Sequence, residues 1–215
     1  MRRWGAGTAA VVRLLIASDD PLTGVTIATM VGVTQPRASQ ILRQLADHDA
    51  ITATPDGYVG ERTKLLYLYA ARARPHLVEP ESYWYSTRPL ADQARRVLAL
   101  ASDHDVTVAF SADLAPDLIA PWRHPTVTIA YLDARLPIED AGLVPAEGRA
   151  DASLITRWTD DQGLLSPAAP WRGEAEGLPV ADPCQQWWDL LDLGGEDRAE
   201  AADRLRTAIV ERTIP

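Results

Sequence analysis

The most constraining feature of this sequence is the segment 26–58, in which two helical patterns follow each other across a short turn. Gly32 lies between them, at a position where glycine adopts a left-handed backbone conformation at little steric cost. Thr34 is a favourable N-cap for the second helix, and Pro36 is tolerated in a first helical turn. The segment therefore predicts a helix-turn-helix.

A strand-turn-strand pattern comes directly after the second helix. Residues 51–54 alternate apolar and polar side chains, and Pro55, Asp56 and Gly57 form a turn signal before Tyr58 begins a return strand. A helix-turn-helix followed by such a hairpin is typical of a winged helix. The alternative is a helix pair that only packs against other helices, but such pairs seldom carry many polar side chains on one face.

The second helix has two contrasting faces. Its apolar residues recur at helical spacing and predict a buried face: Ala38, Ile41, Leu42 and Leu45. Its polar side chains are of the kinds that read base edges or bind phosphates: Gln35, Arg37, Ser39, Gln40 and Arg43. We expect this face to enter a major groove, with Thr34 presenting the helix N-terminus to a phosphate. We expect the wing tip, near the minor groove or the DNA backbone, at Asp56, Gly57 and Tyr58.

The charge distribution also favours the N-terminal part of the chain as the part that contacts DNA. The net charge of −9 is unfavourable for a DNA-binding protein, but residues 1–75 hold nine Lys/Arg against six Asp/Glu. Residues 76–215 hold twelve Lys/Arg against 24 Asp/Glu. Local charge governs phosphate contact, so the basic first part is expected to face double-stranded DNA. The acidic part favours a basic protein partner, or is simply a solvated surface.

Composition argues against a membrane protein, a disulfide-bonded protein and a metal or cofactor site. A hydrophobic fraction of 47% in 215 residues supports a real core, and no apolar run approaches 18 residues, so we expect no membrane span. Cys184 is the single cysteine, which excludes an internal disulfide and fits a cytoplasmic protein with this thiol buried. The four histidines lack metal-ligand spacing, so we expect neither a metal nor a cofactor. One winged helix reads few base pairs, which favours a homodimer or paired sites.

The chain after Pro75 and Pro80 alternates helical and strand patterns. A first helix at 7–18 belongs to the winged helix, and a helical connector is expected at 62–74. Further helices are predicted at 90–102, 113–119, 183–193 and 196–211, with a helical turn at 136–141. Strands are predicted at 106–110, 126–132 and 152–158, with a loop at 159–177 and an edge strand, dimer contact or ligand wall at 83–85. The fold class is therefore α/β (α+β overall), with a winged helix-turn-helix at 1–62, a connector at 63–80 and a mixed-sheet domain at 81–215.

Three segments of this second part carry a resemblance to a known family: 73–77, 106–126, and 182–193 together with 198–202. In this order they resemble the AbiE-type (type IV) antitoxin family. The resemblance implies an N-terminal winged helix that binds promoter DNA, often that of its own operon. It also implies a C-terminal domain of nucleotidyltransferase-like fold and a partner toxin.

The chain departs from an active nucleotidyltransferase. Such enzymes place Gly-Ser at a helix start and Asp-x-Asp on the next strand, whereas the turn here is Phe-Ser-Ala-Asp at 110–113. Asp113, Asp133 and Asp151 are isolated acids at strand ends, which usually cap or are solvated, so we expect no catalysis.

The sequence thus predicts a DNA-binding transcriptional regulator, an autoregulating repressor of antitoxin type. A ligand-sensing winged-helix regulator, an active nucleotidyltransferase and a protein-interaction module are the alternatives.

Overall fold

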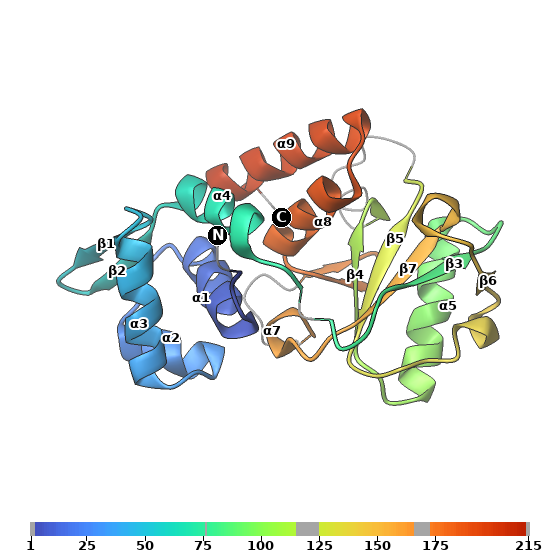
Figure 1. Cartoon of the computed structure of the whole chain (residues 1–215), viewed down its shortest axis with the longest axis horizontal. Helices are drawn as coiled ribbons and strands as arrows, with labels where there is room; N and C mark the ends of the chain where they lie inside the picture. Colours follow the sequence, from blue (N-terminus) through green and yellow to red (C-terminus); the bar gives the residue numbers. More distant parts are fainter. Residues whose placement is uncertain (1–2, 76, 115–124, 166–172, 214–215) are drawn as a thin grey trace. The chain divides into compact units, whose positions relative to one another are not determined.

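The computed structural model describes residues 3–75, 77–114, 125–165 and 173–213 (Figure 1). They form two compact units. Unit 1 contains the described residues up to Pro75 together with Arg206–Thr213, and unit 2 contains the described residues from 77 to Leu205. The predicted mixed α/β class is confirmed, with a helical N-terminal region and a mixed sheet after it.

Unit 1 begins with three helices, α1 (Ala6–Ala17), α2 (Gly24–Val31) and α3 (Gln35–Ala46). Helix α2 starts at Thr23, whose hydroxyl accepts a hydrogen bond from the Thr26 amide at 3.1 Å. It ends at Gly32, which is left-handed with φ of 74°, as the sequence predicts. The two ends of α2 are therefore fixed by one capping hydroxyl at its start and one glycine at the turn into α3.

A hairpin of β1 (Ile51–Thr54) and β2 (Gly57–Gly60) follows α3 and confirms the predicted wing. Tyr58 also pairs with Leu22, which adds a short third strand position from the segment between α1 and α2. Gly57 has φ of 141°, and a Cβ there would lie 2.6 Å from the Leu22 carbonyl carbon. Only glycine fits this approach, so the wing is attached to the helices at a defined point.

Helix α4 (Arg62–Arg72), which the sequence places in a connector, packs within unit 1. Arg13 on α1 donates a buried hydrogen bond to the Tyr69 hydroxyl on α4 at 3.1 Å. The surrounding core is apolar and fully buried: Val11, Val12, Leu15, Ile27, Ile41, Leu45, Leu65 and Leu66.

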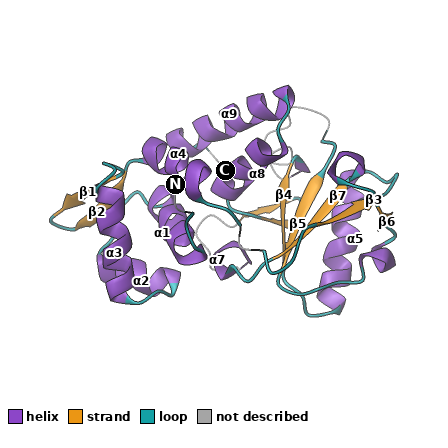
Figure 2. Ribbon diagram, viewed as in Figure 1, coloured by secondary structure: helices purple, strands orange, loops and turns teal. Residues whose placement is uncertain are grey.

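Unit 2 is built on a mixed sheet with the strand order β6-β3-β7-β5-β4-β9-β8 in its described part (Figure 2). The strands are β3 (Ser82–Tyr85), β4 (Val108–Ala112), β5 (Thr128–Leu132), β6 (Val144–Pro145), β7 (Leu154–Trp158), β8 (Gly173–Ala175) and β9 (Leu178–Val180). The β5–β7 and β4–β9 pairs are parallel, and the other pairs are antiparallel.

Helices cover the two faces of this sheet. On one face, α5 (Leu90–Asp103) and the 3-10 helix η1 (Ile138–Ala141) pack on Phe110, Ala130 and Leu154. On the other face, α7 (Gln162–Leu165) packs on Ile129 and Ile155, and α8 (Pro183–Leu193) lies against β4. The 3-10 helix η2 (Arg149–Asp151) precedes β7, and α9 (Glu196–Glu211) begins in unit 2 and ends in unit 1.

The N-terminus of helix α8 lies where its capping residues predict it. The Asp182 carboxylate accepts hydrogen bonds from the first-turn amides of Cys184 and Gln185, and Pro183 is the first helical residue, as predicted. Cys184 is completely buried, which also confirms its predicted packing role.

Other predictions were wrong in detail. The segment 159–177 is not a plain loop, because it contains α7 and β8. The helix predicted at 113–119 is not one of these errors, because it lies mostly outside the described residues and stays a prediction. The predicted strand at 83–85 exists but is not an edge, since β3 pairs with both β6 and β7. Strands β6, β8 and β9 were not predicted, because two or three residues give no readable alternation.

Candidate nucleic-acid interface

Helix α3 presents one buried and one exposed face, as its sequence pattern predicts. The buried face packs with at most 2% exposure at Ala38, Ile41, Leu42 and Leu45. The predicted contact residues are all exposed on this helix and at its N-cap: Thr34, Gln35, Arg37, Ser39, Gln40 and Arg43. The structure therefore brings six of the nine predicted site residues together on one surface.

This exposed face of α3 is basic. No acidic residue occurs from Gln35 to Ala46, and the first carboxylate is the C-cap residue Asp47. Arg37 and Arg43 stand one and a half to two turns apart on the helix, about 9 Å along its axis. The face thus offers two guanidinium groups and several neutral hydrogen-bonding side chains without a competing negative charge.

Arg37 is held in place from two directions. Its Nη1 donates to the Gln40 Oε1 atom at 2.8 Å, and its Nη2 donates to the Thr8 hydroxyl at 3.0 Å. Thr8 lies on α1 and is only 3% exposed, so it anchors the arginine to the rigid part of the unit. Because Arg37 occupies the Gln40 carbonyl oxygen, the Gln40 amide group is the part of that side chain left to donate to a base.

Sequence reasoning missed Thr8. It stands in a helix of small and apolar residues, and nothing in its neighbourhood indicates a partner 29 positions away. Contacts of this kind become visible only when α1 and α3 are folded together.

The start of α3 is open to a ligand. Thr34 is the N-cap with extended backbone, but within the described part of the chain its hydroxyl caps no first-turn amide. The N–H groups at a helix start carry partial positive charge and favour anions. The geometry suits the phosphate contact predicted for Thr34.

The wing differs from the predicted contact surface. Asp56 is exposed, but Gly57 and Tyr58 are only partly exposed because they pair with the Leu22 segment. The tip therefore consists of Pro55 and Asp56, and its only charge is a carboxylate. That charge opposes close approach to a phosphate, so the wing tip is a less favourable contact surface for DNA than the exposed face of α3.

The three isolated acids of unit 2 do not converge. The Asp113 carboxylate accepts hydrogen bonds from Arg198 Nε at 2.8 Å and from the Thr126 amide at 3.0 Å. Asp133 accepts a bond from the Thr107 amide at 2.9 Å, at the opposite end of the antiparallel β4–β5 pair. Among the described residues, no group of three or more His, Cys, Asp or Glu is arranged to hold a metal ion.

Unit 2 instead contains a buried ionic network that the sequence did not reveal. Arg157 on β7 is 2% exposed and donates to the Asp189 carboxylate at 2.6 Å, to the Tyr131 hydroxyl at 2.9 Å and to Glu81 at 2.9 Å. Burial lowers the pKa of Arg157, but Tyr131, Asp189 and Glu81 outweigh that effect and raise it. For Tyr131, burial has the opposite effect and raises the pKa well above its ordinary value, because it disfavours the charged phenolate. These groups fasten α8 to the sheet.

No helix in the described part of the chain is long and apolar enough to span a membrane. Comparisons with protein-family models, curated proteins and solved structures find no match to this chain.

Proposed function

We propose that this protein is a sequence-specific DNA-binding transcriptional regulator that inserts α3 into a major groove. The observation that carries the proposal is the exposed, acid-free face of α3 on a winged-helix framework. Its amide, hydroxyl and guanidinium groups match the donors and acceptors of base edges and phosphates.

Roles follow from the contacts of each side chain. Gln40 donates its amide to a base acceptor, and Arg37 fixes the orientation of Gln40. Among the described residues, Arg43 bonds only to the Ser39 carbonyl, by a long hydrogen bond of 3.4 Å, and its guanidinium is therefore available for a guanine or a phosphate. Thr34 supports a phosphate contact at the helix start.

Autoregulation, repression and a toxin partner form the finer part of the proposal. They rest on the sequence resemblance to AbiE-type antitoxins and on the acidic composition of residues 76–215, which suits a basic partner. Asp113 and Asp133 are engaged in structural hydrogen bonds, which supports a binding role rather than nucleotide transfer.

The test is fluorescence anisotropy with a labelled duplex from upstream of the protein's own gene, beside a scrambled duplex, at two salt concentrations. Gln40→Ala and Arg43→Ala should each weaken specific binding by about 1–3 kcal/mol. Arg88→Ala, an exposed arginine in unit 2, is the charge-matched control. Salt should weaken binding of the native duplex.

Three outcomes of this experiment are informative. Selective binding that is lost in the α3 variants but kept in the control supports the proposal. Wild-type binding by both α3 variants would show that α3 is not the recognition element. If neither duplex binds, a library of random duplexes selected on the wild-type protein finds any distant operator, and failure there rejects the proposal.

A further inference from the structure

A hollow in unit 2 is lined by residues of the neighbouring strands β3, β7 and β5. Its volume is about 330 Å³, within the range of small-molecule sites. Side chains of β3, β7 and the segment after β5 form its walls: Glu79, Pro80, Ser82, Trp84, Leu132, Ala134, Arg135, Leu136, Ile138, Glu139, Thr156 and Trp158. Ser82 pairs with Thr156 in the β3–β7 register, so two hydroxyl side chains lie next to each other in the lining.

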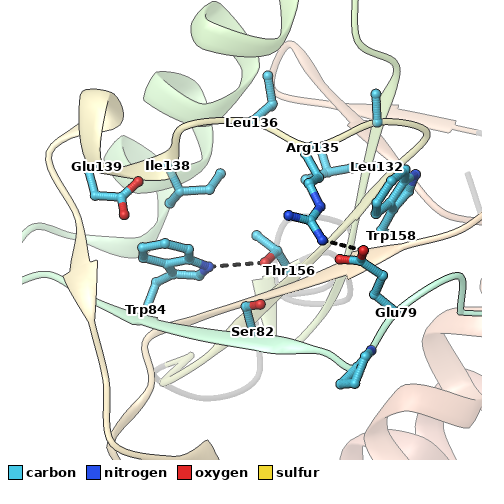
Figure 3. A pocket seen from close by; sticks show the side chains of 12 residues that line it. Glu79, Ser82, Trp84, Leu132, Arg135, Leu136, Ile138, Glu139, Thr156 and Trp158 are labelled. Atoms are coloured by element: carbon cyan, nitrogen blue, oxygen red, sulfur yellow. Dashed lines mark hydrogen bonds and ion pairs between the residues drawn. The ribbon is translucent and has the colours of Figure 1, made fainter.

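Two indole rings stand on opposite sides of this hollow (Figure 3). The Trp84 Nε1 donates to the Thr156 hydroxyl at 3.0 Å, and the Trp158 Nε1 donates to the Asp133 carbonyl at 2.8 Å. Both ring N–H groups are therefore already satisfied. The rings offer a ligand their faces, which carry the negative end of the aromatic quadrupole.

The charges around the hollow are also mostly negative. Glu79 and Glu139 lie on opposite sides of it, and Arg135 is the only cation among the described residues that line it (Figure 3). Arg135 forms an ion pair with Glu79, so its charge is largely compensated. Glu139 has no ion-pair partner among the described residues, and its carboxylate remains free to attract a cation.

Arg135 shows which chemistry the walls accept. Its guanidinium carbon lies 5.4 Å from the centre of the Trp158 ring, a cation–π contact. Its side chain is 71% exposed, so it can leave this position at little cost. Trp84 is partly buried against the apolar core and also lines the hollow, and no cation covers its ring in the described part of the chain.

From these contacts we propose that this hollow is a binding site for a planar aromatic cation, which stacks on Trp84 and pairs with the Glu139 carboxylate. Ser82 and Thr156 supply hydroxyl groups at the floor, where ligand polar atoms find partners. The proposal concerns unit 2 alone and is independent of DNA binding.

The probes are three planar acridines of similar shape and different charge at neutral pH: proflavine as the cation, acridine as the neutral form and acridine-9-carboxylate as the anion. Binding to the whole chain is measured by isothermal titration calorimetry without DNA. Proflavine should bind with one-to-one stoichiometry and more tightly than acridine, while the carboxylate should not bind. Equal binding of all three, or preference for the anion, overturns the proposal.

Two exposed lining residues give opposite expectations. Glu139→Gln should weaken proflavine binding roughly three- to tenfold, whereas Arg135→Gln should strengthen it roughly threefold by removing a competing cation. Glu147→Gln and Arg88→Gln, both exposed and outside the lining, are the matched controls and should leave binding unchanged. All four positions are exposed, so the fold is retained. Loss of proflavine binding in Arg135→Gln would show that Arg135 supports the ligand instead of competing with it, and would refute the assignment.

Discussion

Removal of the Arg157 guanidinium tests whether the ionic network stabilises unit 2. Arg157→Met keeps much of the side-chain length but leaves the Asp189 carboxylate, which is 0% exposed, without its charged partner. Ser111, Tyr131 and Gln185 would still donate to Asp189, but they are neutral. Breaking a buried ion pair on one side typically costs about 3–5 kcal/mol, and we expect a loss in that range.

The other contacts of the carboxylates around Arg157 show which charge would be left unpaired. Asp192 keeps a contact with Arg149 at 3.2 Å when Arg157 is absent, so the unpaired charge is concentrated on Asp189. The double variant Arg157→Met with Asp189→Asn removes that charge and should recover about 1–3 kcal/mol relative to the single variant. Arg95→Met breaks an ion pair with Asp92 at 3.4 Å in which both side chains are half exposed, and it should change the free energy of unfolding by less than about 1 kcal/mol.

Urea unfolding is the assay, followed by far-ultraviolet circular dichroism and tryptophan fluorescence. Trp188 reports directly on the network, since the Arg157 guanidinium lies 5.7 Å from its ring. A loss in Arg157→Met as small as that in Arg95→Met, or a double variant no more stable than the single one, would refute the argument from an uncompensated buried charge.

Three further changes test other parts of the molecule. Gly57→Ala should destabilise unit 1 by at least about 1–3 kcal/mol in thermal unfolding, because the new Cβ meets backbone at positive φ, whereas Gly5→Ala, which meets open space, should have little effect. Thr8→Val removes the anchor of Arg37 and should weaken native-duplex binding about threefold while scrambled-duplex binding stays unchanged; an equal loss on both duplexes would contradict a positioning role. Burial opposes ionisation of Glu81, but the hydrogen bond from Arg149 and the charge and hydrogen bond of Arg157 outweigh burial and lower the pKa of Glu81 below its ordinary value. Ionised Glu81 therefore stabilises the fold above its ordinary pKa, and this contribution disappears as the pH falls through the lowered pKa. Glu81→Gln should accordingly be less stable than the wild type at neutral pH, and the difference in stability should shrink in acid. A difference in stability that stays constant in acid unfolding would argue against this sign.

The winged helix was predictable because its signals are local. Gly32, the N-cap Thr34 and the four buried positions of α3 lie within fifteen residues of each other, and the hairpin follows at once. Helical spacing alone then separates the core face from the exposed face. The strand contribution of Leu22 was not predictable, since a single paired residue leaves no periodic pattern.

The polar interior of unit 2 shows the limit of such reasoning. Arg157 lies in the strand Leu154–Trp158, and a charged side chain is ordinarily exposed, yet its guanidinium is buried against Asp189 of α8. Its partner Asp189 stands 32 positions further along, in a helix whose apolar residues suggest ordinary core packing. Pairings across that distance are decided by tertiary structure, so the sequence offered no signal for them.

Helix α9 has a consequence for the order of folding. Unit 1 is made from two distant stretches of chain, with the whole of unit 2 between them. Its later stretch bonds to the earlier one through Arg212, which forms an ion pair with Asp19 at 2.5 Å and donates to the Ala17 carbonyl. During synthesis these partners meet only after unit 2 has left the ribosome. The proposed DNA-reading unit is thus completed after residues 77–205 of unit 2 are made, although its recognition helix is made before them.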